Sequence, residues 1–345
     1  MPLSFDLSDT TPARGYPAQP AVVVLGDDAI GVLAGSGFGV TPHVDFIAAL
    51  ADRLKIDLSA TLTVMRHLPL WIDGPQHAEL RRKVAAFLAE DRAAKLARAT
   101  TRIRHVVVRT LGTDGSEHVD LFRMVSEVVD LFMEELTGLP RPEGDPSCMP
   151  SIFSSNLGVA ARRRLEAMLK QQFVQANDLF PNEPIELHAL RVGQFVMGRD
   201  ALIGTLGLSL HHHLASLGEQ KVNARRLPSI PTHTGLPAIG RISSFAQTVA
   251  GCPVSAGALI ECRLDSLAGR PAADRRHFFG VGPHLCLGRP LSLALWECVA
   301  DVLAELEIQL TTTEFALAQN DVFDIPLVFT ARKSPPSRLL SGYPV

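Results

Sequence analysis

A glycine-rich segment in the last quarter of the chain surrounds a single cysteine and runs into an apolar helical pattern. It reads Phe-Gly-Val-Gly-Pro-His-Leu-Cys-Leu-Gly over residues 279–288. Gly280, Gly282 and Gly288 would allow tight bends and a close approach of the backbone to the sulfur of Cys286. The cysteine is predicted at a helix N-terminus, where the helix dipole and free N–H groups would lower its thiol pKa and hold a metal-ligating thiolate. The alternative is a buried structural cysteine in a turn before a helix.

A histidine and an arginine one helical turn apart form a second candidate site. Pro75 suits the first turn of a helix, and His77 and Arg81 follow it at positions i and i+4. Residues at this spacing share one helix face, so the pair can bind a carboxylate together. Because Arg82 and Lys83 come directly after, a solvated basic helix face is the alternative interpretation.

These two segments resemble those of the cytochrome P450 superfamily. The motif Phe-Gly-x-Gly-x-His-x-Cys-x-Gly is similar to the haem-binding loop of that family. The resemblance implies that Cys286 is the proximal thiolate ligand of the iron of haem b, a ligand that favours O–O cleavage by donating electron density. It also implies that Phe279 covers the sulfur side of the ring and that His284 reaches a haem propionate.

The resemblance assigns further residues to the haem carboxylates. It implies that His77 and Arg81 hold the propionates from the helix beside the haem, and that Arg241, which precedes a predicted strand, meets the other propionate. Together with His284, these side chains supply enough donors to neutralise two buried carboxylates, which are costly to desolvate without partners.

Residues 196–205 resemble the oxygen-binding signature of the family only in part. Gly198 is in register with it and would let a ligand approach the helix backbone. Where the family carries a threonine whose hydroxyl helps deliver protons, this chain has Ala201. Thr205 lies one turn further along the same face, and either substitutes for that threonine or, as we expect, bonds back to its own helix.

An acidic residue at the centre of the same predicted helix is also in register with the signature. By the resemblance, Asp200 is the candidate for proton relay on the oxygen side. An ion pair with Arg199 or Arg191 is the alternative.

The resemblance has a gap between the oxygen-binding signature and the cysteine loop. The family carries a Glu-x-x-Arg pair on a helix shortly before the position of Arg241, and a later arginine completes its ion-pair network. Residues 227–234 contain neither residue, and their two prolines disfavour a helix. Arg270 is the candidate for the later arginine. Since buried ion pairs often add little net stability, the loss need not unfold the core.

Helical patterns dominate the elements that must position these residues. Short strands are predicted at 20–26, 241–264 and 325–331, and an irregular stretch at 227–240. Helices are predicted at about 43–56, 75–111, 117–137, 159–180, 186–217 and 287–307. We therefore expect a mainly α fold with a small β region, a cytochrome P450-like single domain over residues 1–345 that encloses a haem.

Composition excludes several classes of protein. The formal net charge is −3, and without a basic block nucleic acid is not an expected partner. The five cysteines are scattered without a Cys-x-x-Cys pair, which argues against a disulfide framework or a zinc ribbon. Residues 1–6 do not begin a signal peptide, and no apolar run approaches the roughly 18 residues of a membrane span. We expect a soluble, cytoplasmic protein.

Three kinds of chemistry remain open for such a protein. The first is monooxygenation of a small, natural-product-like organic substrate; because no flavin or iron–sulfur module is evident, a ferredoxin-type donor with its reductase would supply the electrons. The second is haem-thiolate chemistry without reductive O2 activation, as in a peroxygenase, a dehydratase or a rearrangement enzyme. The third is a non-catalytic haem-binding protein.

Overall fold

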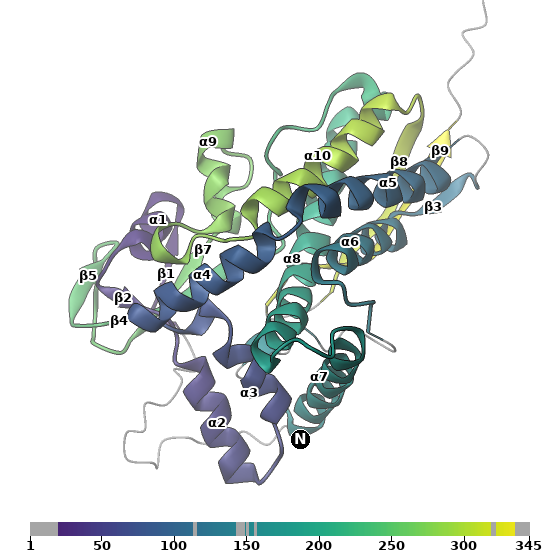
Figure 1. The fold of residues 1–345 in the computed structure, drawn as a ribbon. Coiled ribbons are helices and arrows are strands. Elements are labelled where there is room, and N and C mark those ends of the chain that lie inside the picture. The colour runs from purple at the N-terminus through teal and green to yellow at the C-terminus, as the bar shows by residue number, and fades with distance from the viewer. Residues whose placement is uncertain are drawn as a thin grey trace, which may run out of the picture.

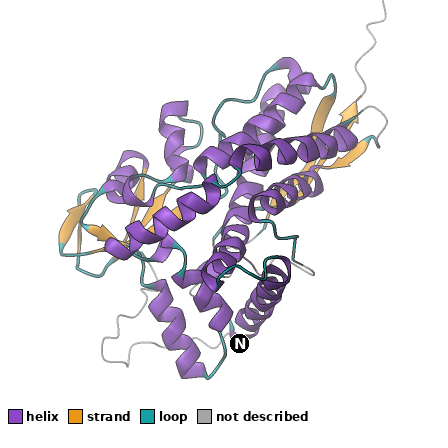
Figure 2. Ribbon diagram, viewed as in Figure 1, coloured by secondary structure: helices purple, strands orange, loops and turns teal. Residues whose placement is uncertain are grey.

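Helices dominate the part of the chain that the computed structural model describes, which comprises residues 20–112, 116–142, 149, 152–154, 157–318 and 322–334 (Figures 1 and 2). Residues 1–6, which were interpreted from the sequence, lie outside this part. The prediction of a mainly α fold with a small β region is confirmed. Among the described residues, no helix combines the length and the apolar character that crossing a bilayer requires.

The bounds of the regular elements follow in chain order for the described residues. The helices are α1 (Gly26–Ala34), α2 (His43–Leu54), α3 (Ser59–Arg66), α4 (Pro75–Ala89), α5 (Arg92–Leu111), α6 (Leu121–Thr137), α7 (Val159–Leu179), α8 (Ile185–Leu217), α9 (Ala272–Arg275) and α10 (Arg289–Glu305). The strands are β1 (Val22–Leu25), β2 (Phe38–Gly39), β3 (His118–Asp120), β4 (Ala238–Ser243), β5 (Gln247–Val249), β6 (Cys252–Val254), β7 (Leu259–Arg263), β8 (Gln309–Leu317) and β9 (Pro326–Ser334).

Two small sheets lie at separate ends of the helical body (Figure 2). One has the strand order β1-β7-β4-β2, in which β1 and β7 are parallel and the other pairs are antiparallel. The other has the order β3-β9-β8 and is antiparallel throughout. Strands β5 and β6 form a separate hairpin. The pattern of the sequence predicted most of these strands but missed β2, β3 and β8.

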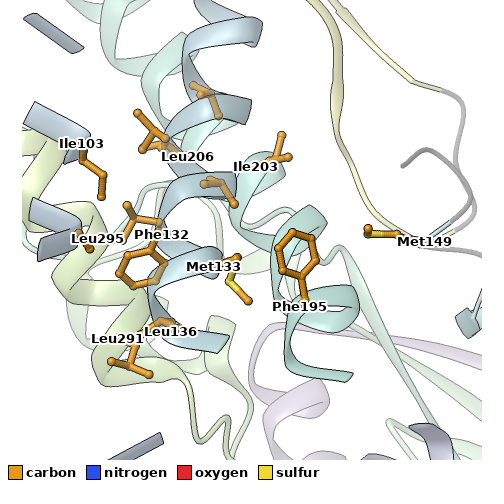
Figure 3. Packing of buried hydrophobic residues seen from close by; sticks show 14 of the residues in the cluster. Ile103, Phe132, Met133, Leu136, Met149, Phe195, Ile203, Leu206, Leu291 and Leu295 are labelled. Atoms are coloured by element: carbon orange, nitrogen blue, oxygen red, sulfur yellow. The ribbon is translucent and has the colours of Figure 1, made fainter. Parts of the chain in front are cut away.

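Helix α8 runs through the centre of the molecule and organises the core (Figure 1). It begins after Pro184, ends at Gly218, and contacts α3, α6, α7, β8 and β9. A helix that is covered on nearly all sides carries apolar residues all round, and this one does. Figure 3 shows Phe132 and Met133 of α6 among side chains of α8 and α10, so one continuous cluster joins the three helices.

The long helical pattern over residues 75–111 is two helices in the structure. Helix α4 ends at Ala89 and α5 begins at Arg92, because Asp91 adopts a left-handed conformation with φ of 47°. Aspartate tolerates this conformation better than most residues do. Without a glycine or a proline there, the sequence gives no strong signal for the break.

A buried arginine that the sequence analysis did not single out, Arg275, holds the irregular stretch before β4. Arg275 donates hydrogen bonds to the carbonyl oxygens of Ile230 and Pro231, at 3.2 and 3.0 Å. Arg270, the candidate for the later arginine of the family's ion-pair network, forms ion pairs with acidic residues of α1 and α9. Backbone carbonyl oxygens therefore accept hydrogen bonds from the buried guanidinium of Arg275, in a segment that has no Glu-x-x-Arg pair.

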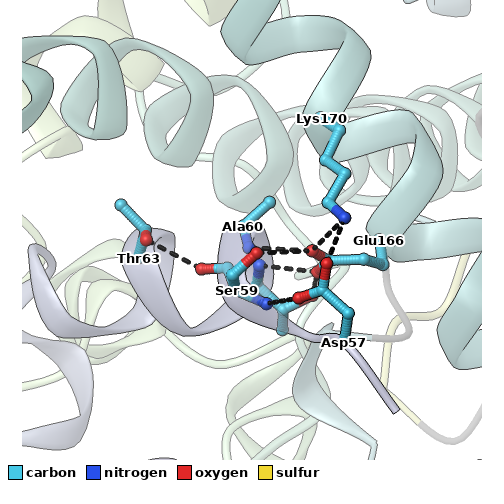
Figure 4. Close-up of polar contacts among 7 residues, drawn as sticks. Asp57, Ser59, Ala60, Thr63, Glu166 and Lys170 are labelled. Carbon is cyan, nitrogen blue, oxygen red and sulfur yellow. Dashed lines mark hydrogen bonds and ion pairs between the residues drawn. The ribbon is translucent and has the colours of Figure 1, made fainter.

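A buried carboxylate of α7 caps the N-terminus of α3, as Figure 4 shows. Glu166 accepts hydrogen bonds from the backbone N–H groups of Ala60 and Thr61, both at 2.9 Å, and from the Thr61 hydroxyl, also at 2.9 Å. The first N–H groups of a helix lack partners within the helix, so this carboxylate replaces a local cap. The contact fixes α3 against α7.

Replacing Glu166 with alanine should lower the free energy of unfolding by about 3 kcal/mol, because the substitution strands buried N–H groups that cost roughly 1–3 kcal/mol each. Urea unfolding measures this loss. Lys170→Ala is the control: the ammonium group of Lys170 is exposed, so water screens its ion pairs with Asp57 and Glu166 and their loss should lower stability much less. Equal losses in the two variants would contradict the capping role.

Candidate functional site

The cysteine loop is closed by its own backbone. The N–H of Cys286 donates to the carbonyl oxygen of Phe279 at 2.8 Å. Gly280 and Gly282 have φ of 73° and 66°, a left-handed conformation that other residues rarely adopt, so the bend requires these two glycines. Helix α10 starts only at Arg289, which places the cysteine just before the helix instead of at its first turn.

Cys286 lines a cavity and is exposed to that space. Burial raises the pKa of this thiol, and hydrogen bonds from the backbone N–H groups of Gly288 and Arg289 and the charge of Arg81 lower it less. The predicted lowering of the pKa is therefore wrong for the protein without a bound cation, although the expected N–H donors are present. A Cβ at Gly288 would lie an ordinary 3.7 Å from Sγ, so this glycine is not needed for close approach.

Two histidines predicted to bind a carboxylate lie side by side next to the cysteine loop. The rings of His77 and His284 are 4.1 Å apart, and Nε2 of His284 bonds to Oδ1 of Asp73 at 2.8 Å. Nε2 of His77 is buried and has no hydrogen-bond partner among the described residues. Burial, with the neighbouring ring as a further cause, lowers the pKa of His77. The sequence analysis gave no role to Asp73, which lies two residues before the predicted helix.

The two predicted arginines complete this cluster. Arg81 lines the cavity and forms no ion pair with a described residue. Arg241 lies within β4 instead of preceding a strand; it is buried and donates only to the carbonyl oxygen of Gly240, at 3.0 Å. Burial lowers the pKa of both guanidinium groups. Among the described residues, neither the half-buried Arg81 nor the buried Arg241 bonds to a carboxylate, so the two cations form a site that favours an anion.

A cavity of about 310 Å³ joins the cysteine loop to α8. Most of its wall is apolar, as in typical small-molecule sites. Cys286, Phe279, Arg81 and His284 line it together with one face of α8. The α8 residues of that face are Gln194, Met197, Gly198, Ala201, Leu202, Thr205 and Leu206. The structure thus brings together the cysteine, part of the carboxylate-binding set and most of the predicted oxygen-side residues.

Asp200 does not line this cavity. Its carboxylate accepts a bond from Nη1 of Arg199 at 2.7 Å, and Nε of Arg199 also bonds to Asp130 of α6 at 2.5 Å. Burial raises the pKa of Asp200 above its usual range despite the neighbouring guanidinium. Of the two interpretations made from the sequence, the structure shows the ion pair with Arg199.

The glycine and the threonine on the cavity face have partners that the sequence does not reveal. A Cβ at Gly198 would lie 3.0 Å from the methyl group of Met133, so this glycine permits close packing of α6 on α8. The hydroxyl of Thr205 accepts a hydrogen bond from the N–H of Gly235 at 2.9 Å, instead of the expected bond to its own helix. Both partners come from other elements, so periodicity along α8 could not identify them.

No protein-family model and no curated protein matches this sequence. Solved structures do match it. P450BioI in complex with an acyl carrier protein ligated to hexadec-9Z-enoic acid superposes with a TM-score of 0.67, at 13% identity over 90% of this chain and 92% of that chain. The tirandamycin C-bound P450 monooxygenase TamI gives 0.65, at 18% identity over 90% and 89%. The versatile cytochrome P450 enzyme CYP109B1 from Bacillus subtilis gives 0.59, at 14% identity over 90% and 92%. The chain has the cytochrome P450 fold.

The residues around the cavity fit the haem that the P450 fold implies. Within the described residues, the buried Nε2 of His77 has no hydrogen-bond partner and the cations of Arg81 and Arg241 bond to no carboxylate, as expected where two propionates bind. The sulfur of Cys286 faces an apolar space and receives two backbone N–H bonds, as a thiolate ligand requires.

A second glycine of α8 makes an even closer contact than Gly198 does. A Cβ at Gly204 would lie 2.3 Å from the carbonyl oxygen of Asp324 and 2.7 Å from Cα of Gly235, and neither backbone atom can move aside cheaply. At Gly204, the segments that contain Gly235 and Asp324 therefore pack directly against α8.

Gly204→Ala should therefore lower the free energy of unfolding by about 3 kcal/mol or more through overpacking. Gly31→Ala, in helix α1, is the matched control because no atom lies within 4 Å of the added methyl group. That substitution should stabilise the protein by up to about 1 kcal/mol, since alanine is the better helix former. Urea unfolding of both variants tests the pair, and a Gly204→Ala protein as stable as the parent would refute the close packing.

Proposed function

We propose that this protein is a haem-thiolate monooxygenase of the cytochrome P450 type, acting on a small, natural-product-like organic substrate as one domain. The observation that carries the proposal is the sulfur of Cys286, which faces an apolar cavity while two backbone N–H groups bond to it. A structural cysteine in a turn would need neither the cavity nor the unpaired cations beside it.

In this proposal the cysteine loop and the cluster next to it bind the haem. Cys286 is the axial ligand of the iron, and Phe279 covers the sulfur side. His77 and Arg81 of α4, Arg241 of β4 and His284 of the loop hold the propionates. Asp73 orients His284 through the bond at 2.8 Å and so presents its ring toward His77. When bound, haem supplies the redox chemistry that activates oxygen, and its thiolate ligand favours O–O cleavage.

The face of α8 lines the space for substrate and oxygen. Gly198, Ala201 and Thr205 are the residues of this helix that we propose beside the reacting atoms. The hydroxyl of Thr205 keeps its own proton available, because it accepts a bond from Gly235. Asp200 points to Arg199 and the buried charges of α6, so it acts only if that ion pair opens.

Monooxygenation places one oxygen atom of O2 in the substrate and releases the other as water, with two electrons and two protons supplied from outside. We propose a ferredoxin-type protein with its reductase as the electron donor. The second candidate function is oxidation driven by hydrogen peroxide. Because peroxide is O2 already reduced by two electrons, this reaction needs no electron donor. It is favoured by Ala201, which has no hydroxyl to donate a proton on the cavity face of α8.

The test uses the haem-loaded protein with a surrogate ferredoxin, its reductase and a reduced nicotinamide. Carbon monoxide added to the reduced protein should give the red-shifted absorption band of a thiolate-ligated haem. Candidate substrates should then accelerate nicotinamide consumption and form oxygenated product. Product with hydrogen peroxide alone would select the second candidate. A thiolate-ligated haem that supports neither reaction would select a non-catalytic haem-binding protein.

A further inference from the structure

One amide stands among apolar side chains in the wall of the cavity. Gln194 lies on the α8 face that also carries Gly198 and Ala201, and it lines the same cavity. Its side chain forms no hydrogen bond with another described residue. An amide in an apolar space is unfavourable unless water or a ligand satisfies it. The mechanism proposed above assigns no role to this side chain.

The backbone next to Gln194 is fixed in place. A Cβ at Gly193 would lie 2.7 Å from Cδ1 of Leu68, so α8 packs closely against the segment between α3 and α4. Gln194 is the next residue along α8, so this close contact restrains the backbone that carries its amide. A fixed polar group in an apolar pocket provides specificity more than bulk affinity.

The surrounding wall is hydrocarbon and aromatic. Leu68 and Leu70 line it on the side of α3, and Phe153 and Phe323 line it with their rings edge to face, 5.4 Å apart. Such faces favour flat or bulky apolar groups of a ligand.

The charged side chains that line the cavity, Arg81 and His284, belong to the cluster assigned above to the propionates. A substrate carboxylate or ammonium group near α8 would therefore be desolvated without a partner of opposite charge.

We propose that the substrate is a neutral, largely hydrocarbon molecule whose carbonyl oxygen accepts a hydrogen bond from the amide of Gln194. This inference rests on the proposed function and narrows its substrate class. Gln194 is then a specificity-determining residue: it selects which neutral molecule binds and in which orientation, without touching the haem.

Three naphthalenes of similar size test this inference: 2-acetylnaphthalene with a carbonyl group, 2-ethylnaphthalene without oxygen, and 2-naphthoate with a charge. Their dissociation constants are measured by equilibrium dialysis on the haem-loaded protein, after its carbon monoxide spectrum has been recorded. We expect 2-acetylnaphthalene to bind about tenfold more tightly than 2-ethylnaphthalene, and 2-naphthoate to bind most weakly.

Gln194→Leu should bring the dissociation constants of 2-acetylnaphthalene and 2-ethylnaphthalene within about twofold of each other. Gln194→Met replaces it as the test variant if the leucine variant folds poorly. Met197→Leu, on the same face of α8, is the matched control and should keep the tenfold ratio. A ratio near one in the unsubstituted protein, or an unchanged ratio in both Gln194 variants, would overturn the inference while a thiolate spectrum leaves the proposed function intact. If that spectrum is missing, the proposed function fails and this inference fails with it.

Discussion

Replacing Cys286 with alanine should abolish the red-shifted carbon monoxide band of the reduced protein completely. The substitution removes the only cysteine among the described residues that line the cavity, so iron in that space would keep no thiolate ligand. Haem retained by the propionate-binding residues should then absorb as a haem ligated by nitrogen or water. The absorption spectrum of the reduced, carbon monoxide-bound protein measures this change directly.

Cys252→Ala provides the control for this experiment. Cys252 is exposed on β6 and lies outside the cavity, so its loss should leave the band at full intensity. Haem content and unfolding temperature of both variants separate loss of the ligand from loss of the fold. A red-shifted band that persists in Cys286→Ala would refute the assignment of the axial ligand, and with it the proposed function.

The cysteine loop could be predicted from the sequence because its geometry is local. Positive φ values at Gly280 and Gly282 depend on residue type, and the apolar repeat that follows is a property of one helix. The long buried helix α8 was predicted for the same reason. Periodicity located its bounds within one residue, and its burial follows from the apolar residues on most of its faces.

Contacts between segments far apart in the chain could not be predicted. The sequence placed Asp200 in register with a signature. Only the fold shows that Arg199 bonds both to Asp130 of α6 and to the carboxylate of Asp200, which does not line the cavity. Likewise, Thr205 meets Gly235 because α8 crosses the irregular stretch there. Resemblance gives a register along the chain, whereas the direction of a buried polar group depends on which partners the tertiary structure supplies.

Arg241, the buried arginine of β4, is a residue whose partner of opposite charge would come from a bound ligand. Since burial lowers the pKa of Arg241, the folded protein holds its charged form less favourably than the unfolded chain does. The cation therefore costs folding free energy in the protein without haem. Asp73 offsets part of this cost through its charge, but its carboxylate is bonded to His284 and to the N–H of Val40.

Arg241→Leu should therefore change stability and haem affinity in opposite directions. Without haem, the variant should be at least as stable as the parent and up to about 3 kcal/mol more stable, because an apolar side chain replaces a poorly paired buried charge. Haem binding should weaken by about 3 kcal/mol, more than a hundredfold in dissociation constant, since a buried propionate loses its partner. Urea unfolding of the haem-free protein and haem titration measure the two effects.

Arg263→Leu is the matched control on the neighbouring strand β7. Arg263 is already paired with Glu261 and Asp265, whereas Arg241 donates only to a backbone carbonyl oxygen among the described residues, so the loss of Arg263 should leave haem affinity within about twofold of the parent. Parallel losses of stability and haem affinity in Arg241→Leu would instead show that the guanidinium supports the fold. Opposite changes would show that this site keeps an unfavourable charge for the anion it binds, the trade of stability for function that binding sites commonly make.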